Sequence, residues 1–596
     1  TCQIGVAYGE DLNHLTVVPE PIIPTVPETL YSGTTGRRDV IYVGHGTYEE
    51  AVVNTAVDDL TFLGGYDATW RRDLRNAETV VCPNDAAKHG FQLTRVSRNT
   101  VDGFVIRGAN AGVYATGPSD QPTGVDRIRC LHHVRHVVVS NCVNGVSTDD
   151  GWCGLRVYAS LMAYNSKNGI RLNINNRCAL SVHNVTLVGN GEYGLFLGWN
   201  SHSFEVRNTV FADNTLGGIV LDGNSSSLGL WNCLFDEPNR CVYLKNATFT
   251  AYPASGLLFL PAQLGEDFAP AIGSPCAGSG MSFEGHPLYE SDDDLYGTPW
   301  NGVYDIGCLK ASGYVAKLAD VYVSPAGDDA NDGATAERPM RTAQLAERRV
   351  AAGGTLHLAA GEYEGPLALM TERMKLAGAG RDQTVVKGGT GLADDYKSRM
   401  GVQIAAHDIV VRDLSVTGSK GSGIQLGLQC AATNECVERC EIKGNATGVG
   451  YASFPNGGLL VQQCCDVWQT RLAKPRFTHC VISNCWELGA CQNDDAYTGG
   501  GGALVMYAGN VRNCLFTKNV RETATGVAGC YYGTVRINGG TLANCTIAGN
   551  SAGSCAGVWA KKTSGRVVNC VIADNVATKD VAANLPVWAG EPSVFS

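Results

Sequence analysis

Side chains suited to binding an acidic sugar chain recur at regular intervals between residues 154 and 245. Short strands are predicted to begin near Gly154, Gly169, Gly194, Gly218 and Cys241. Alternation along these strands predicts two outward columns: Arg156, Arg171, Phe196 and Tyr243 in the first, and Tyr158, Asn173, Asp222 and Lys245 in the second, with Trp199 beyond them at a turn. Arginine forks onto carboxylate or sulfate groups and aromatic rings stack on sugar rings, so this face is predicted to bind an anionic glycan. The alternative is an ordinary solvated sheet face.

No catalytic residue can be assigned to this face from the residues alone. A lyase needs a base, commonly Arg or Lys, beside a calcium ion that neutralises the substrate carboxylate, and a hydrolase needs two carboxylates at working separation. Asp222 is the only acid in the two columns. Other acids and imidazoles on neighbouring segments match no catalytic template by their spacing: Asp149, Asp150, His132, His133 and His136.

Four oxygen-bearing side chains are grouped near the middle of the chain. They are Asp328, Asp329, Asn331 and Asp332. Carboxylate and amide oxygens are ligands that Ca²⁺ prefers, so calcium is the one cofactor that the residues suggest. The alternative is a polar turn with Asn-Asp-Gly chemistry, in which the same side chains bond the local backbone.

The element that must position these residues is a repeat of about two dozen residues. Asn184 aligns with Asn208, Asn190 with Asn214, and Gly194 with Gly218. Each repeat holds short alternating apolar runs punctuated by Asn and Gly, which is typical of a parallel β-helix. The Asn residues are predicted to stack in a ladder and to accept a left-handed corner. A leucine-rich repeat is the rival, but its spaced Leu consensus is missing.

The whole chain is predicted to be a tandem duplication. The tetrapeptides Gly46 to Glu49 and Gly361 to Glu364 correspond, within segments that recur in the same order. The fold class is therefore all-β, with two tandem right-handed parallel β-helices, each with a short N-terminal capping element. The predicted divisions are a first unit at 1–310 with a closing segment at 265–310, a linker at 311–320, and a second unit at 321–596 that lacks a closing segment.

Four cysteines occupy one equivalent position of the second unit's repeats. Cys480, Cys514, Cys545 and Cys570 each precede an alternating apolar pair, so they are predicted to point inward as a column of small hydrophobic side chains. No paired CxxC clusters or His spacing suggest zinc. Because 23 cysteines are present, at least one thiol is unpaired within the chain. Disulfides remain an alternative if the protein is exported, and their connectivity cannot be read from the sequence.

Two segments carry a family resemblance. Residues 322–342, with Tyr322 to Pro325, Gly327-Asp328 and Asn331 to Gly333, resemble the opening of right-handed parallel β-helix repeat proteins of the pectate-lyase-like superfamily. The resemblance implies an amphipathic capping helix, which Thr342 to Ala352 fits. Repeats such as ANCTIAGN (Ala543 to Asn550) are similar to coils of surface-associated β-helix proteins of planctomycete and verrucomicrobial bacteria. These motifs specify the fold and not the chemistry.

Composition limits the partners. A net charge of −11 argues against nucleic acid or an anionic membrane, and no run of about 18 apolar residues spans a bilayer. With 73 Gly and 17% charged residues, the chain is expected to be an extracellular or cell-surface protein. The leading hypothesis is a structural or adhesive protein that associates with itself, with neighbouring surface proteins or with polysaccharide. The alternative is a polysaccharide lyase or glycoside hydrolase acting on an anionic glycan along the first unit.

Overall fold

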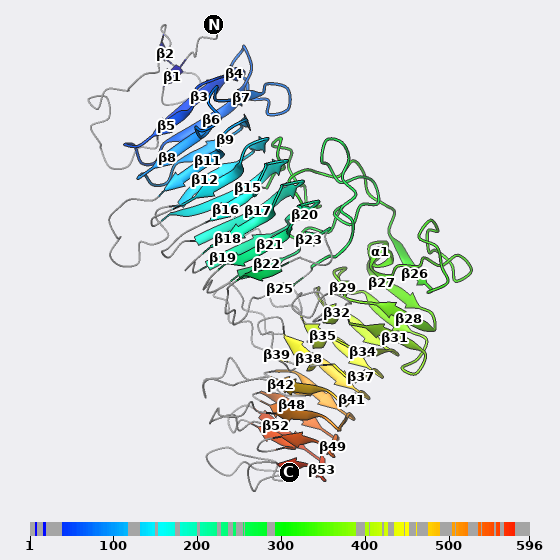
Figure 1. The fold of residues 1–596 in the computed structure, drawn as a ribbon. Coiled ribbons are helices and arrows are strands. Elements are labelled where there is room, and N and C mark those ends of the chain that lie inside the picture. The colour runs from blue at the N-terminus through cyan, green and yellow to red at the C-terminus, as the bar shows by residue number, and fades with distance from the viewer. Residues whose placement is uncertain are drawn as a thin grey trace. The chain divides into compact units, whose positions relative to one another are not determined.

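The computed structural model divides into two compact units, one formed by residues 1–249 and 258–314 and the other by residues 250–257 and 315–596. The structure describes residues 6–8, 16–18, 39–116, 131–149, 153–172, 179–198, 203–222, 228–236, 242–245, 254–255, 257–282, 292–388, 400–404, 406–419, 422–426, 434–445, 447–451, 460–461, 475–488, 503–506, 508–522, 534–537, 539–552, 556–560 and 565–577. Within them the secondary structure is almost entirely β-strand (Figure 1). No helix of the described residues is long and apolar enough to cross a membrane.

The first unit is built on a long parallel sheet, called sheet 1. Its strands in spatial order are β3 (Val40–Gly44), β6 (Thr61–Tyr66), β9 (Thr100–Asp102), β12 (Leu131–Arg135), β15 (Gly154–Ala163), β17 (Ala179–Val188), β19 (Ser203–Arg207) and β22 (Leu228–Trp231). A side branch holds β4 (Gly46–Tyr48), β7 (Thr79–Val81), β10 (Val105–Arg107), β13 (Val138–Ser140), β20 (Val210–Ala212) and β23 (Leu234–Phe235). The long strands β15 and β17 run through both parts, because their second halves pair with β13 and β20.

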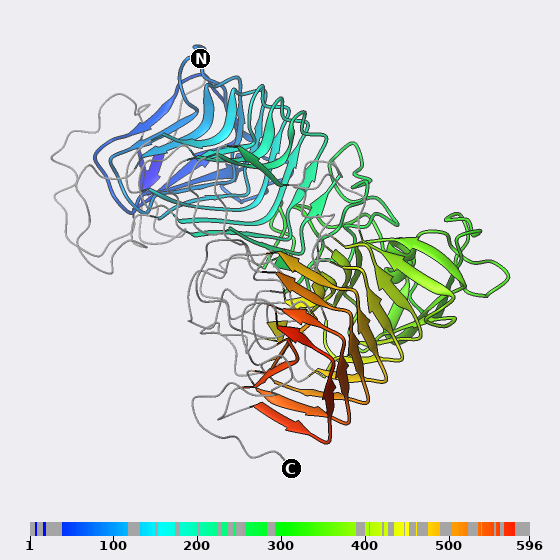
Figure 2. The ribbon, with the colours of Figure 1, turned by 60° about the horizontal axis from the view of Figure 1, so that its bottom comes forward.

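A second parallel sheet, called sheet 2, completes each coil of the first unit. Its strands are β5 (Val52–Asn54), β8 (Phe91–Thr94), β11 (Ala111–Thr116), β14 (Asn144–Thr148), β16 (Ile170–Leu172), β18 (Tyr193–Leu197), β21 (Gly217–Asp222) and β24 (Val242–Lys245). The chain passes from sheet 1 to the branch and then to sheet 2 before it returns one rung further along, as the nested coils in Figure 2 show. This confirms an all-β fold of the parallel β-helix type.

The second unit repeats this construction with two long parallel sheets. Sheet 3 consists of β26 (Leu318–Val323), β27 (Val350–Leu358), β30 (Lys375–Gly378), β33 (Val410–Arg412), β36 (Cys436–Glu438), β40 (Arg476–Thr478), β44 (Asn510–Arg512), β48 (Gly540–Ala543) and β52 (Gly565–Val568). Sheet 4 consists of β28 (Gly361–Glu364), β31 (Thr384–Lys387), β34 (Ser415–Thr417), β37 (Glu441–Lys443), β41 (Val481–Ser483), β45 (Leu515–Thr517), β49 (Thr546–Ala548) and β53 (Val571–Ala573).

Three shorter parallel sheets complete the coils of the second unit. They are β29 (Leu367–Leu369), β32 (Met400–Ile404), β35 (Ser422–Leu426) and β38 (Thr447–Tyr451); β39 (Leu460–Val461), β43 (Leu504–Met506), β47 (Val535–Ile537) and β51 (Val558–Ala560); and β42 (Trp486–Leu488), β46 (Val520–Glu522), β50 (Ser551–Ala552) and β54 (Val576–Ala577). The remaining strands are the antiparallel pair β1 (Val6–Tyr8) and β2 (Thr16–Val18), and β25 (Ala254–Ser255), which follows β22 in the order of sheet 1.

The helix of the second unit is shorter than the sequence predicts. The helix α1 spans Ala343–Glu347, with Thr342 at its N-cap, whereas the prediction ran from Thr342 to Ala352. The strand β27 already begins at Val350, because its β-branched and aliphatic residues pair with β26 and β30. Asp329 holds the start of the helix, since its carboxylate accepts hydrogen bonds from Thr342 N and Thr342 Oγ1 at 2.8 and 2.7 Å.

The repeated asparagines form two sets with different roles, whereas the sequence predicts one ladder that also forms the corners. Asn165 donates to Asn190 Oδ1 at 3.0 Å, and Asn190 donates to Asn214 Oδ1 at 2.8 Å, so these three buried side chains join successive coils. A different set forms the left-handed corners, with φ of 51° at Asn184 and 43° at Asn208. Asparagine suits both positions, because its amide bonds along the stack and its short side chain tolerates positive φ.

Candidate functional site: the outward face of sheet 1

The face of sheet 1 that is turned away from the apolar core carries two columns of polar and aromatic side chains, fixed by the strand register. Several of these side chains are buried, among them Tyr158, His183 and Arg207. One column contains Thr100, His133, Arg156, Ser181 and Glu205. The other contains Asp102, Arg135, Tyr158, His183, Arg207 and Trp231. These two columns are called the charged face. Neighbouring strands lie about 4.8 Å apart, so members of one column are in contact range of one another.

At the middle of the charged face an imidazole meets a phenol between two arginines. His133 Nδ1 lies 2.9 Å from Tyr158 Oη, and the rings meet edge to face with centroids 6.2 Å apart. The register places Arg156 directly beside His133 and Arg135 directly beside Tyr158. The guanidinium groups of Arg135 and Arg156 therefore lie on adjacent strands, one on each side of the His133–Tyr158 pair.

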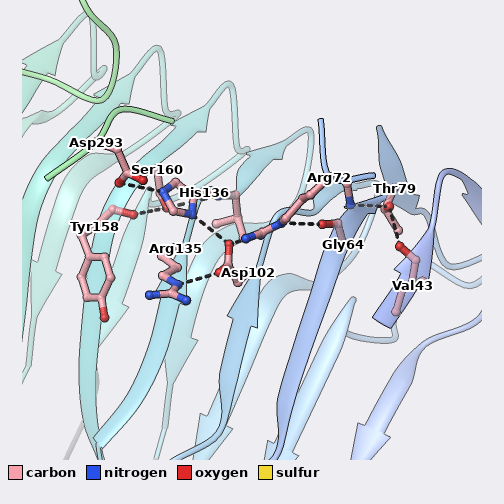
Figure 3. Close-up of polar contacts among 12 residues, drawn as sticks. Val43, Gly64, Arg72, Thr79, Asp102, Arg135, His136, Tyr158, Ser160 and Asp293 are labelled. Carbon is pink, nitrogen blue, oxygen red and sulfur yellow. Dashed lines mark hydrogen bonds and ion pairs between the residues drawn. The ribbon is translucent and has the colours of Figure 1, made fainter. Parts of the chain in front are cut away.

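A buried ion network anchors one of these arginines (Figure 3). Asp102, whose side chain is fully buried, accepts hydrogen bonds from Arg135 Nε at 2.6 Å, from His136 Nδ1 at 2.8 Å and from Arg72. Burial alone would raise the pKa of Asp102, but the hydrogen bond from His136 and the charges of His136, Arg72 and Arg135 hold it well below its usual range. Asp102 is therefore a permanent anion that fixes the orientation of Arg135.

A second group of contacts continues the charged face toward β22. His183 Nε2 lies 3.2 Å from Glu205 Oε1, and the same carboxylate accepts a short hydrogen bond from Arg207 Nε. The Arg207 guanidinium lies over the Trp231 ring, 4.3 Å from its centroid. Burial lowers the pKa of His183, against the opposing effect of Glu205, so this imidazole is neutral at physiological pH.

The described parts of the predicted closing segment, residues 265–282 and 292–310, lie along the side of the coil stack. Its backbone bonds the corner asparagines of three successive coils: Asn232 donates to Ser279 O at 3.2 Å, Asn208 to Met281 O at 2.9 Å, and Asn184 to Gly307 O at 3.4 Å. Further along the stack Asp293 bonds His136, and the Arg75 guanidinium lies 4.5 Å from the centroid of Tyr296. The segment is a strap that ties coils from the region of β7 to that of β22.

Part of the predicted binding face is wrong in its alignment. Arg156 and Tyr158 lie on β15 of sheet 1, whereas Arg171 and Phe196 lie on sheet 2. Gly154 and Gly169 are closer in sequence than one coil, so the strands that begin there are successive sides of a single coil and not stacked neighbours. The predicted first column therefore divides between two sheets.

The remaining predicted residues fall as follows. On sheet 2, the backbone register aligns the positions of Arg171, Phe196 and Tyr243, and the Arg171 guanidinium lies 5.8 Å from the Phe196 centroid and is bonded to Asp149. Asp222 and Lys245 are register partners. Asn173 and Trp199 lie outside the described residues.

The predicted calcium ligands serve the local backbone in this structure. Asp328 accepts a hydrogen bond from Ala330 N, Asp332 from Ala334 N, and Asn331 donates to Pro339 O. Within the described ranges no group of three or more His, Cys, Asp or Glu side chains is arranged to hold a metal ion. These contacts are the ones expected of a polar turn that supports α1.

Sequence reasoning missed several members of the charged face. His133 and His136 were noted but matched no template, and Asp102, Arg135, His183 and Arg207 were not considered. The available signal was the spacing of 23 to 25 residues that relates Arg135, Tyr158, His183 and Arg207. That spacing becomes visible only when the starts of the sheet 1 strands are known.

Comparisons with known proteins assign the chain to no family. No family model matches the chain, and no curated protein matches it. Among solved structures, a mutant of an alginate lyase of the PL6 family aligns over 94% of this chain and 97% of its own, at 10% identity and a TM-score of 0.23. The unmutated enzyme aligns over 93% and 97%, at the same identity and score. At this identity and TM-score the two structures support no conclusion about the fold or the activity of this chain.

Proposed function

We propose that the protein is an exported or cell-surface protein of two tandem right-handed β-helices whose first unit binds a carboxylated polysaccharide on the charged face of sheet 1. The observation that carries the proposal is the placement of Arg135 and Arg156 on adjacent strands, on either side of the His133–Tyr158 pair. Guanidinium groups fork onto carboxylates, and phenol and imidazole rings supply flat surfaces and hydrogen bonds for sugars. A polysaccharide lying along the stack crosses one rung after another and meets a new side chain at each.

The fixed geometry of the face favours binding of an extended, repetitive ligand. Parallel coils present their outward side chains at one repeated spacing of about 4.8 Å, so a polymer with regular charges meets regularly spaced partners. Asp102 removes rotational freedom from Arg135, which lowers the entropy lost when that guanidinium binds a carboxylate.

Binding is tested by measuring retention of the whole chain on immobilised polyuronates, sulfated glycans and neutral glycans. The proposal expects retention on polyuronates, weakened roughly tenfold by Arg156→Ala, which corresponds to about 1.4 kcal/mol. Arg156→Lys keeps the charge but loses the fork, so it should be intermediate. The matched control is Arg171→Ala on sheet 2. If Arg171→Ala abolishes retention and Arg156→Ala does not, the binding face is on sheet 2 and the proposal is wrong.

A second candidate is a polysaccharide lyase that uses the same face, and the His133–Tyr158 hydrogen bond favours it. In β-elimination a base removes the proton next to the carboxylate, the bond to the leaving glycosidic oxygen breaks, and a carbon–carbon double bond forms as an acid protonates that oxygen. An imidazole and a phenol within 2.9 Å can supply the base and the acid. The neighbouring arginines would neutralise the substrate carboxylate.

Product formation separates the two candidates. Unsaturated uronate ends absorb in the ultraviolet, so incubation of the protein with each polyuronate reports elimination directly. A lyase predicts that Tyr158→Phe removes this absorbance while retention on the same polymer persists. Retention without any absorbance change from the unsubstituted protein would leave binding as the function and exclude elimination of that polymer.

A further inference from the structure

The second unit holds a continuous stack of thiols in its interior. Cys440, Cys480, Cys514 and Cys545 are buried, and Cys570 at the end of the series is partly buried. Each follows a residue with positive φ at the corner between sheets 3 and 4, so all five occupy the same place in successive rungs. Four of them are predicted from the sequence repeat, and the structure adds Cys440 at the start.

The backbone register shows that these cysteines are related by simple translation along the stack. The carbonyl of Cys440 accepts a hydrogen bond from Val481 N, the carbonyl of Cys480 from Leu515 N, and the carbonyl of Cys514 from Thr546 N. The sulfurs follow the same order, because Cys514 makes side-chain contacts with both Cys480 and Cys545, and Cys570 makes one with Cys545. The backbone N–H of Cys514 also lies 3.5 Å from Cys545 Sγ.

Translation by one rung disfavours disulfides within this stack. Residues related by translation have Cβ atoms separated by the strand spacing of about 4.8 Å, whereas a disulfide needs about 3.5–4.5 Å. The five cysteines are unbonded in this structure. The stack is therefore a set of reduced thiols whose neighbours are held at a fixed separation.

That separation suits a soft metal ion held between two sulfurs. Metal–thiolate bonds are about 2.3 Å long, so an ion on the line between two sulfurs spans about 4.6 Å, close to the rung spacing. Thiolate sulfur selects soft ions such as Cu⁺ and excludes hard ions such as Mg²⁺ and Ca²⁺. We propose that adjacent rungs of this cysteine stack, with Cys514 and Cys545 at its centre, bind soft thiophilic cations in two-sulfur coordination.

The charge balance favours a neutral complex in this apolar interior. When Hg²⁺ binds, two S–H bonds break, two Hg–S bonds form, and two protons leave to solvent, so the buried site stays uncharged. When Cu⁺ binds, one proton leaves and the second sulfur donates as a neutral thiol, which again leaves no net charge. Neutrality matters because a buried, unpaired charge in this core would be costly. The partly buried Cys570 places one end of the stack nearest to solvent.

The test uses the whole reduced chain, loaded anaerobically with Hg²⁺ and then challenged with an excess of a competing dithiol. The proposal expects the unsubstituted chain to retain ions that the double variant C514S/C545S loses, with roughly tenfold weaker retention in the variant. X-ray absorption should show two sulfurs at about 2.3 Å in the retained fraction. The matched control is C233A/C308A, which removes two buried cysteines of the first unit.

Two outcomes would overturn the inference. If the unsubstituted chain and C514S/C545S retain Hg²⁺ equally, the ions bind outside the cysteine stack. If only C233A/C308A loses Hg²⁺, the ions bind in the first unit. If C514S/C545S fails to fold, the single variants C545S and C570S replace it, the second of which alters the end of the stack nearest to solvent. Each should then take up Hg²⁺ more slowly or retain it more weakly than C233A does. A rise in the thermal midpoint of the unsubstituted chain on loading gives an independent readout.

Discussion

His136 Nε2 lies 3.1 Å from Asp293 Oδ1, which joins a corner of sheet 1 to the strap across 157 positions of sequence. The other ring nitrogen of His136 bonds Asp102 at 2.8 Å. The imidazole therefore bridges two carboxylates, one in the coil stack and one in the strap. The charge of this residue decides how firmly the strap is held at this end.

The first prediction concerns pH. Burial lowers the pKa of His136, but hydrogen bonds and charge from Asp102 and Asp293 outweigh it, so the pKa is raised. A raised folded pKa contributes stability that is fully present below the unfolded value of about 6.5 and is lost as pH rises through the folded value. His136→Gln should therefore lower the thermal midpoint most near pH 5.5 and least near pH 8.5. His45→Gln, at an exposed position, is the control. If the difference in thermal midpoint between His136→Gln and the unsubstituted chain grows as pH rises, the bridge between Asp102 and Asp293 is contradicted.

The second prediction concerns the strap itself. Asn208 donates to Met281 O at 2.9 Å and accepts from Met281 N at 3.1 Å, while its own backbone has φ of 43°. Asn208→Gly keeps the positive φ but loses both bonds, so it should destabilise the first unit by about 1–3 kcal/mol in denaturant unfolding. Asn208→Ala should cost more because it adds backbone strain. If the glycine variant unfolds like the unsubstituted chain, the side-chain bonds do not hold the strap.

The third prediction concerns a gap in the ladder of the second unit. Asn519 bonds Asn550, and Asn550 bonds Asn575, at 2.9 Å in both cases, but the rung before Asn519 carries Cys485. Asn445 occupies the same place one rung earlier. Cys485→Asn should connect Asn445 to the ladder that begins at Asn519. It should raise the free energy of unfolding by about 1 kcal/mol. Cys485→Ala is the comparison, and an asparagine variant less stable than the alanine variant would show that the rung lacks room for the amide.

The fourth prediction concerns Glu435, which is fully buried and whose two carboxyl oxygens have no hydrogen-bond partner within the described part of the chain. Burial raises its pKa to about 7. Because the unfolded chain ionises this group from about pH 4.3 upward, the folded state loses stability as pH rises toward 7. Glu435→Gln should therefore be increasingly stabilising relative to the unsubstituted chain between pH 4 and pH 8, by up to about 3 kcal/mol. Glu337→Gln, at an exposed position, should show no such trend.

The sequence by itself determined the repeated coil and its corner residues. The spacing of Asn184 and Asn208, and of Asn190 and Asn214, is the spacing of the coils, because each coil must return to the same place before the next can stack on it. The inward cysteines followed for the same reason, since Cys514 and Cys545 hold one equivalent place in the longer repeats of the second unit. The predicted self-association and calcium binding remain predictions.

Only the tertiary structure decided which side chains share a face. Arg156 and Arg171 look equivalent in the sequence, but one coil has several sides, and the number of residues between Gly154 and Gly169 places them on different sheets. The bridge from His136 to Asp293 was equally hidden, because nothing local links residues so distant in sequence. Periodicity specifies contacts between neighbouring coils. The path of the strap depends on contacts between residues far apart in the sequence, which no local pattern encodes.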